Sequence, residues 1–247
     1  MSVITVRGLA KSFGTNRAVR DVSFTVERGE TLGILGPNGA GKSTTVECIG
    51  AMTKPESGTI RVLGMNPFAE PVPVRRALGY QMQSTTLPAQ LRVGEALRMF
   101  AAFYPDPMDD AELLEAVGLS EVAGRAFGVL SGGQRQRLSI ALALVGRPRV
   151  LILDEITTGL DPEGRRDVWK LIEDIRASGV TVLLVSHAID EVERLCDRIA
   201  VIVDGRSVYT GTPAQLIRRV LPDPEITGAR SLEDAYLKLV AEQRMEG

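Results

Sequence analysis

Nine residues, GPNGAGKST at 36–44, constrain the fold of this chain most, because they follow an apolar run and precede a helical pattern. The run TLGILG at 31–36 predicts a buried strand, and residues 42–52 predict a helix that the stretch TKPESG ends. The segment matches G-x-x-x-x-G-K-[ST] in the order strand, loop and helix, which is the context that makes this motif significant. We therefore expect a phosphate-binding loop at the carboxyl end of a strand.

The residues of this loop each have a chemical use at a phosphate group. Glycines let backbone N–H groups converge on phosphate oxygens, and the N-terminus of the helix adds a positive partial charge. Lys42 supplies a full charge for the β- and γ-phosphates, Ser43 is placed to ligate magnesium, and Thr44 is placed to donate to the α-phosphate. The plainer alternative is a glycine turn before a helix with a surface lysine. The expected nucleotide-binding residues are Gly36, Asn38, Gly39, Ala40, Gly41, Lys42, Ser43 and Thr44.

Strand and helix patterns alternate on both sides of the loop. Residues 3–8 and 22–35 predict short strands with a turn at ERGE, which indicates an antiparallel flap at the start of the chain. From residue 150, the strand VLILDE, a helix around 168–175 and the strand VTVLLVSH follow one another, and IAVIVD and RSVYTG predict two more strands. Such alternation favours a parallel sheet surrounded by helices.

Residues 84–130 carry a mostly helical pattern. Leu97, Phe100, Ala101 and Tyr104 share one helical face, and PDPMDD separates this helix from the next. We therefore predict an α/β fold with a parallel sheet, an N-terminal antiparallel β flap and an inserted helical lobe. Near the end of the chain, a last amphipathic face either caps the core or meets a partner; its residues are Leu232, Tyr236, Leu239 and Val240.

Two acids and the only histidine follow two of the predicted strands. Asp154 and Glu155 end VLILDE, at the edge where parallel sheets collect ligands. Because adjacent acids there are costly without cations, we expect Asp154 to hold magnesium and Glu155 to polarise an attacking water. His187 ends VTVLLVSH, and this position favours a place with Glu155 beside the γ-phosphate over a purely structural role. The alternative for the acids is a pair that merely ends a strand.

A second loop with glycines and a hydroxyl, LSGGQRQR at 130–137, precedes another helix. Ser131 and the amides of Gly132 and Gly133 predict an anion site with a hydroxyl donor, although the same residues are also typical of a simple N-cap. The helix has a buried face formed by Leu138, Ala141, Leu142 and Val145. One nucleotide needs only one such phosphate-binding loop, so the second loop indicates a second binding role.

Composition excludes several classes of protein. The net charge of −2 provides no broad positive field for DNA, so we expect no nucleic-acid partner. The longest apolar runs, such as VTVLLV, fall far short of the roughly 20 residues that span a bilayer. Cys48 and Cys196 lack metal-ligand spacing and suit a reducing cytoplasm as small buried residues.

In their order along the chain, these motifs resemble those of one family, the ATP-binding cassette (ABC) subunits of membrane transporters, from about residue 3 to 215. The motifs are Phe13 in KSFG, GPNGAGKST, Gln83 in GYQMQ, LSGGQ, LILDE, TTGLD ending at Asp161, and His187 in SH. The resemblance implies one nucleotide-binding domain. It comprises a P-loop NTPase core at about 1–83 and 146–215, a helical lobe at about 84–145 and a C-terminal helical tail at about 216–247.

The resemblance also implies roles for single residues. Phe13 stacks on adenine, Gln83 ligates magnesium and links the core to the lobe, Glu155 is the general base, and His187 orients water and the γ-phosphate. Ile156 stands where the family usually has proline, and it restores an N–H that proline lacks. We expect this exchange to alter the stiffness of the loop without loss of catalysis.

Partners follow from the same resemblance. In this family two cassettes pair head to tail, so ATP with Mg²⁺ lies between one chain's phosphate loop and the other chain's signature loop. The signature loop of this chain consists of Ser131, Gly132, Gly133 and Gln134. Asp161 would lie at the interface between the two chains. A second copy of the chain and a separate transmembrane permease are the expected partners, at the cytoplasmic face of the cell membrane.

The lobe and the tail are similar to the branch that exports drugs, antibiotics, polysaccharides or lipids. Leu87, Pro88 and Leu91 would then line the groove that receives a permease helix. The alternative is a soluble cassette ATPase that acts on the ribosome, on DNA or on an assembly or regulatory complex. The single cassette and the short gap between phosphate loop and signature count against the ribosomal and DNA-repair kinds.

Overall fold

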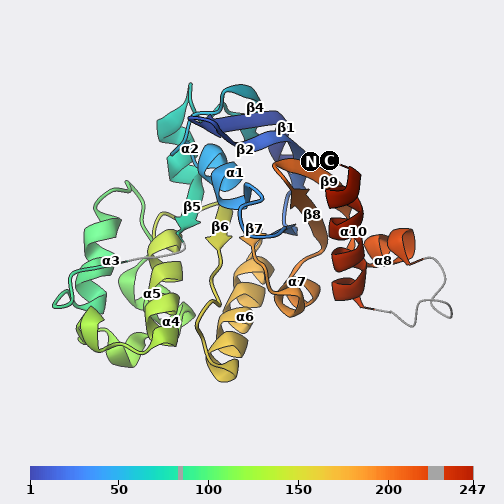
Figure 1. The fold of residues 1–247 in the computed structure, drawn as a ribbon. Helices are drawn as coiled ribbons and strands as arrows, with labels where there is room; N and C mark the ends of the chain where they lie inside the picture. The colour runs from blue at the N-terminus through green and yellow to red at the C-terminus, as the bar shows by residue number, and fades with distance from the viewer. Residues whose placement is uncertain (83–85, 222–230, 247) are drawn as a thin grey trace. The chain divides into compact units, whose positions relative to one another are not determined.

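The chain forms two compact units, which are described separately. The computed structural model describes residues 1–82, 86–221 and 231–246 (Figure 1). Unit 1 consists of Met1–Pro71 and Leu183–Gly247, and unit 2 of Val72–Val182. In the described part of the chain, every helix is too short or too polar to cross a membrane.

The strands of unit 1 combine an antiparallel flap with a mixed sheet. Strand β1 (Ser2–Phe13) pairs antiparallel with both β2 (Asn16–Glu27) and β4 (Ser57–Val62). Strand β3 (Thr31–Leu35) pairs parallel with β8 (Arg198–Val203), which pairs antiparallel with β9 (Arg206–Gly211). The order within the unit is β4-β1-β2-β9-β8-β3. The predicted flap is confirmed, and it is wider than predicted because the pattern at 57–62 did not indicate a strand.

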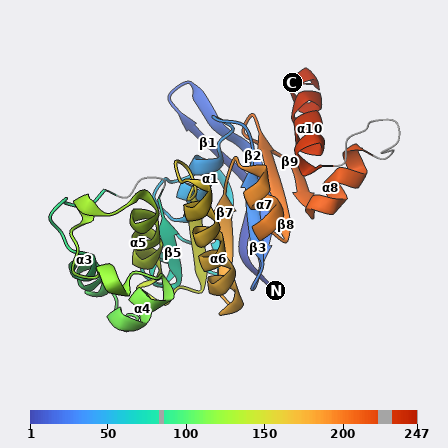
Figure 2. The ribbon, with the colours of Figure 1, turned by 90° about the horizontal axis from the view of Figure 1, so that it is seen from below.

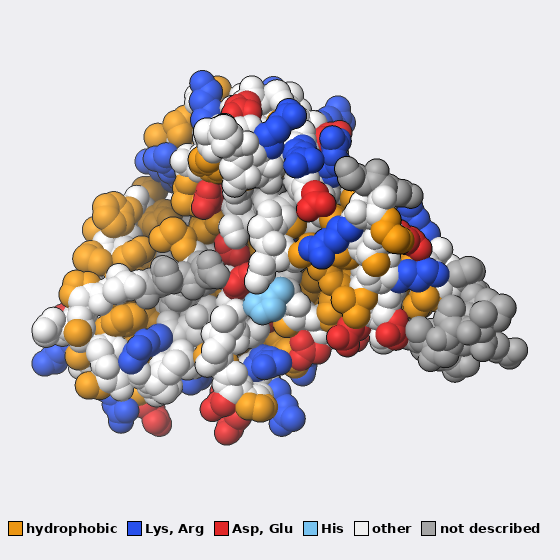
Figure 3. All heavy atoms as spheres, viewed as in Figure 1, with side chains coloured by type: hydrophobic (Ala, Val, Ile, Leu, Met, Phe, Trp, Pro, Cys, Tyr) orange, Lys and Arg blue, Asp and Glu red, His pale blue; other side chains and the backbone are white. Residues whose placement is uncertain are grey.

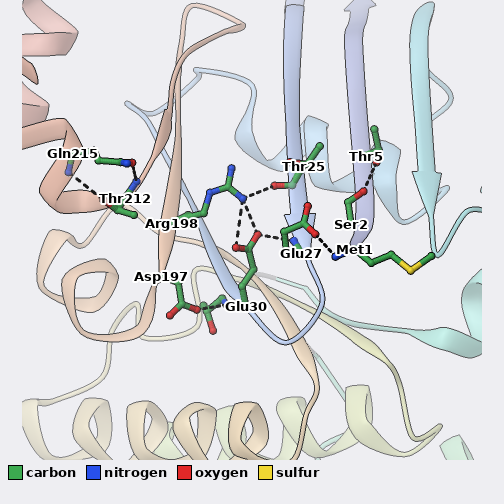
Figure 4. Close-up of polar contacts among 11 residues, drawn as sticks. Met1, Ser2, Thr5, Thr25, Glu27, Glu30, Asp197, Arg198, Thr212 and Gln215 are labelled. Carbon is green, nitrogen blue, oxygen red and sulfur yellow. Dashed lines mark hydrogen bonds and ion pairs between the residues drawn. The ribbon is translucent and has the colours of Figure 1, made fainter.

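A polar cluster holds the turn between β2 and β3 against β8 (Figure 4). The guanidinium of Arg198 donates to Glu30 Oε1 at 3.1 Å and to the carbonyl oxygen of Thr25 at 3.4 Å. Asp197 Oδ2 accepts the N–H of Thr31 at 2.9 Å. Because Glu30 and Arg198 are mostly shielded from water, this pair is screened less than a surface ion pair. The cluster therefore fixes the start of β3, the strand that leads into the phosphate loop.

Helices α1 (Lys42–Ile49), α7 (Ile189–Leu195), α8 (Pro213–Val220) and α10 (Leu232–Glu246) complete unit 1. Figure 2 shows α10 beside α8, which it contacts together with α7 and β8. Leu232, Leu239 and Val240 are buried, and Lys238 Nζ donates to the carbonyl oxygen of Val220 at 2.9 Å. Of the two alternatives for the last amphipathic face, capping of the core is the one that the structure shows.

Unit 2 pairs a short parallel strand ladder with helices. Strand β5 (Leu78–Gln81) pairs parallel with β6 (Val150–Asp154). The helices are α2 (Pro71–Ala77), α3 (Val93–Ala101), α4 (Asp110–Ala116), α5 (Gly132–Leu144) and α6 (Pro162–Ala177), with 3₁₀ turns η1 (Ser120–Val122) and η2 (Phe127–Val129). Helix α5 packs on β5, β6, α3, α4 and α6.

The buried face predicted for α5 is confirmed. Leu138, Ala141 and Leu142 on α5, and Val145 at its C-cap, are all buried. On α6, Val168, Leu171, Ile172 and Ile175 form a second buried face. Strand β7 (Thr181–Val185) lies where the chain passes from unit 2 to unit 1. The α/β class predicted from the sequence is confirmed, whereas the LGYQ strand at 78–81 was missed because it has only four residues.

Candidate nucleotide-binding site

The loop between β3 and α1 is organised around a buried lysine. Lys42 is 5% exposed, and its Nζ donates to the carbonyl oxygens of Gly36 at 2.8 Å and of Pro37 at 3.2 Å. A buried ammonium is costly unless it is hydrogen-bonded, and here the loop that it helps to form supplies the acceptors. The charge of Lys42 is therefore held inside the curve of the loop.

Two glycines of the loop are required by close backbone contacts. A Cβ at Gly36 would lie 2.2 Å from the carbonyl oxygen of Ile202 on β8, and a Cβ at Gly41 would lie 2.3 Å from that of Ala18 on β2. Gly41 also has a φ of +96°, in the region that favours glycine. At the far end of the loop, the N–H of Gly205 donates to Ala40 at 3.1 Å. The loop backbone therefore packs closely against β2, from the start of the chain, and against β8, from its end.

The N-terminus of α1 has the form of an anion site. Its N-cap, Gly41, has no side chain, and no side-chain cap hydrogen bond is present there. Asn38 and Gly39 are exposed at the loop surface, and Ser43 and Thr44, which carry hydroxyls in the first turn, are half-buried. Backbone N–H groups, a lysine and two hydroxyls together fit a phosphate chain and an associated divalent cation.

Two further predicted residues lie in unit 1. Phe13, at the end of β1, is 50% exposed, so part of its ring is available at the surface, and Lys11 Nζ lies over the ring at 5.2 Å from its centre. His187 is exposed directly after Ser186. The N–H of Ser186 donates to Ile34 on β3 at 3.3 Å, and its Oγ accepts the N–H of Ala188 at 3.0 Å. The histidine therefore follows a residue that is hydrogen-bonded to the strand entering the phosphate loop.

In unit 2, the two acids end strand β6 as predicted. Asp154 is 4% exposed and Glu155 is half-buried with a φ of +50°, which is uncommon for a residue other than glycine. Ile156 is fully buried. The residue in place of the family's proline is therefore a core side chain, and its burial holds the backbone that follows Glu155.

The loop LSGGQ forms a closed cap on α5. Ser131 Oγ accepts the N–H of Gln134 at 3.2 Å, while Gln134 Oε1 accepts the N–H of Ser131 at 3.0 Å. This is a reciprocal capping box. A Cβ on Gly132 would lie 3.6 Å from Leu160, and one on Gly133 would lie 4.0 Å from Gly164, so the starts of α5 and α6 lie side by side.

Asp161 caps α6 with its side chain alone, without the reciprocal bond of a capping box. Its Oδ1 accepts the N–H of Gly164 at 2.7 Å. Unit 2 therefore brings Asp161 and the signature residues together on exposed helix starts, whereas Gln83 lies outside the described residues. Unit 1 brings together β3, which leads into the phosphate loop, and Ser186, which directly precedes His187.

The sequence analysis missed one buried polar residue, Gln81. It is 2% exposed at the end of β5, and its Oε1 accepts the backbone N–H of Asp154 at 3.2 Å. The signal was present, because a glutamine that ends the apolar strand LGYQ must find hydrogen-bond partners if it is buried.

Comparison with known proteins agrees with these features. The sequence pattern of the family described as ABC transporter matches residues 19–158. The chain is 39% identical over 220 residues to Nod factor export ATP-binding protein I of Ralstonia nicotianae, over 87% of this chain and 68% of that protein.

Solved structures are similar as well. One described as the ATP-binding subunit of an ABC transporter has a TM-score of 0.83 and 29% identity, over 96% of this chain and 99% of that one. A dimeric ATP-binding cassette in a post-hydrolysis state with ADP and phosphate has a TM-score of 0.75 and 25% identity, over 85% and 98% of the two chains. This chain therefore belongs to the ABC transporter family, as an ATP-binding subunit that couples ATP hydrolysis to transport.

Proposed function

We propose that this chain powers an exporter, as two head-to-tail copies bound to a separate transmembrane permease at the cytoplasmic face of the membrane. The observation that carries the export direction is the 39% identity to a protein named for Nod factor export. The described helical lobe of unit 2 also exposes large apolar side chains, among them Met99, Phe103 and Val129. Figure 3 shows hydrophobic side chains, in orange, gathered at the left of the face in view. We propose this lobe, about residues 84–145, as the part that meets the permease, with Leu87, Pro88 and Leu91 in the groove.

The phosphate loop is proposed to hold the β- and γ-phosphates of ATP. Lys42 supplies the positive charge, the N–H groups of Gly39 and Gly41 supply donors, and Thr44 reaches the α-phosphate. Phe13 offers its exposed ring face to adenine. Asn38 and Ala40 contribute through the backbone.

A magnesium ion would be held by the Ser43 hydroxyl and the Asp154 carboxylate, with Gln83 as a further ligand. Hydroxyl, carboxylate and amide oxygens are the donors that this hard cation prefers. When bound, the ion neutralises negative charge on the phosphate oxygens.

Glu155 is the proposed general base. Its uncommon φ of +50° indicates local backbone strain directly after β6, the strand that ends at Asp154. Such strain is often found where a side chain must be aimed at a reacting group. Glu155 would accept the proton of the attacking water, and His187 would orient that water and the γ-phosphate.

The signature residues are proposed to serve the partner's nucleotide. Ser131, Gly132, Gly133 and Gln134 form an exposed helix start next to the Asp161 turn, which suits a surface that meets a second copy. The dimeric cassette with ADP and phosphate, which is similar to this chain, supports this arrangement. ATP would then hold two copies together, and hydrolysis would release them.

The base assignment is tested by Glu155→Gln. We expect hydrolysis to fall by about 10²- to 10⁴-fold because general-base catalysis contributes that much, while ATP affinity stays within twofold. Glu163→Gln, at an exposed glutamate in the first turn of α6, is the matched control and should retain full turnover. Unchanged turnover in Glu155→Gln would refute the assignment.

The exporter proposal is tested with the same slow variant. Tagged Glu155→Gln protein, loaded with ATP and magnesium in native extract, should copurify with a polytopic membrane protein that mass spectrometry identifies. The double variant Glu155→Gln, Ser131→Arg should lose the ATP-dependent fraction of that recovery. Stoichiometric recovery of ribosomes, or of soluble proteins without a membrane protein, would contradict the proposed function.

A further inference from the structure

The carboxyl ends of β5 and β6 are joined by one side chain. The last pair of the ladder between these neighbouring strands is Gln81 with Leu153 (Figure 1). Beyond it, the N–H of Asp154 is accepted by Gln81 Oε1 at 3.2 Å. The other end of the same amide donates to the carbonyl oxygen of Met82.

Both ends of the Gln81 amide are therefore engaged in a nearly dry environment. Gln81 is 2% exposed and Asp154 is 4% exposed, so water cannot readily replace the hydrogen bond between them. A buried N–H without an acceptor is strongly disfavoured, and the backbone of Asp154 must shift if this acceptor is lost. Any such shift moves the carboxylate of Asp154 with it.

The second contact links this backbone to the surface. Met82 is 51% exposed and directly follows Gln81 at the end of β5. Displacement of the chain at Met82 would pull on the amide of Gln81 and, through it, on the N–H of Asp154. Hydrogen bonds that support metal ligands from behind commonly control how well the ligand is placed.

We propose that Gln81 is a positioning residue for ATP hydrolysis, which sets the place of the Asp154 carboxylate and ties it to the exposed residue Met82. The inference rests on the proposed magnesium role of Asp154. Gln81 does not touch the nucleotide in this scheme, because its two hydrogen bonds are to the backbone of Asp154 and Met82.

The test compares Gln81→Met with Leu78→Met. Both substitutions place methionine in β5, and Leu78 is also buried but is an apolar side chain at the other end of the strand. Manganese replaces magnesium as a paramagnetic probe, and its dissociation constant is measured by electron paramagnetic resonance with ADP bound. Turnover, the KM for ATP and the melting temperature are measured on the same proteins.

We expect Gln81→Met to raise the manganese dissociation constant about tenfold and to lower kcat by a similar factor, with the KM for ATP within twofold. Leu78→Met should leave manganese binding unchanged. Gln81→Asn, whose shorter amide cannot span the same contacts, should behave like Gln81→Met and serves if that variant does not fold. Equal manganese affinity in the Gln81 variants and in Leu78→Met would overturn the inference.

Asp154→Asn separates failure of this inference from failure of the proposed function. If Asp154→Asn binds manganese as tightly as the unaltered protein, the magnesium role of Asp154 is wrong and the inference about Gln81 fails with it. If Asp154→Asn weakens manganese binding and the Gln81 variants do not, only the inference about Gln81 is wrong.

Discussion

Two glycine-containing helix starts, at α1 and at α5, differ in how their backbone N–H groups are satisfied. At α1 the N-cap is Gly41 in a left-handed conformation without a side-chain cap, and the nearby ammonium of Lys42 is held by loop carbonyls. At α5 the N-cap is Ser131, and its side chain and that of Gln134 cap each other's backbone N–H groups. We call the N-terminus of α1 open because no side chain caps it, and the N-terminus of α5 closed because side chains cap it.

This difference bears on how each site would bind a phosphate. An open helix start with a positive charge gains most from an anion, which suits α1 to the proposed binding of the phosphates of ATP. At α5, Ser131 Oγ and Gln134 Oε1 accept backbone N–H groups in the cap, whereas the Ser131 O–H and the Gln134 NH₂ group are donors that can reach a ligand without breaking the cap. The α5 site is therefore stable without a nucleotide, which fits a surface that binds the partner's ATP only while two copies are closed.

Removal of the charge at the open start should have the largest effect. We expect Lys42→Ala to weaken ATP binding by about tenfold to a hundredfold, since hydrogen bonds to charged groups contribute about 1.5–3 kcal/mol. A titration with a fluorescent nucleotide measures this. Lys54→Ala, at an exposed lysine, is the control and should bind normally. A normal dissociation constant for Lys42→Ala would contradict the role of the phosphate loop.

A methyl group in the open loop should have the next largest effect. We expect Gly36→Ala to lower the free energy of unfolding by about 1–3 kcal/mol, because its Cβ would meet a backbone carbonyl at 2.2 Å. Gly124→Ala, where no atom lies within 4 Å of the new Cβ, is the matched control. Urea denaturation checks both variants. Equal stability of Gly36→Ala and Gly124→Ala would show that the loop can move away from β8.

Loss of the closed cap should affect stability but not nucleotide binding by a single copy. We expect Ser131→Ala to cost about 1 kcal/mol in the free energy of unfolding and Ser131→Gly only a few tenths. ATP affinity of the monomer should be unchanged in both. An Ala variant as stable as the unaltered protein would mean that the capping box contributes nothing, and the contrast with α1 would then fail.

The smallest expected effect concerns the rate of thiol labelling at Cys48, which tests whether the buried face of α1 stays packed. Burial raises the pKa of the Cys48 thiol to about 11, so at pH 8 only about a thousandth of it is thiolate, the reactive form. We expect iodoacetamide to label Cys48 very slowly at pH 8 and faster as the pH rises towards that pKa. Mass spectrometry after proteolysis distinguishes Cys48 from Cys196. Rapid labelling of Cys48 at pH 8 in folded protein would show that α1 moves away from the core and exposes the thiol.

The sequence predicted those parts of the site in which local pattern and chemistry coincide. The phosphate loop, the acids at the end of β6 and the buried face of α5 each lie within a short segment with its own periodicity. The Lys42 to Met52 helix ends earlier, at Ile49, because Gly50 follows as its C-cap. Strands β4 and β5 escaped prediction because SGTIRV and LGYQ each include a glycine and polar residues instead of a continuous apolar run, and they form by pairing with β1 and β6.

The motifs by themselves determined the family, because their residue types and order need no knowledge of distant contacts. Only the tertiary structure decided why Gly36 must be glycine, since the carbonyl that excludes a side chain there belongs to Ile202, 166 positions along the chain. The same holds for Gln81, whose partner Asp154 is brought to it by strand pairing. Local sequence sets backbone preference and chemical type, whereas packing sets which distant atoms come within hydrogen-bond distance, and that choice depends on the whole chain at once.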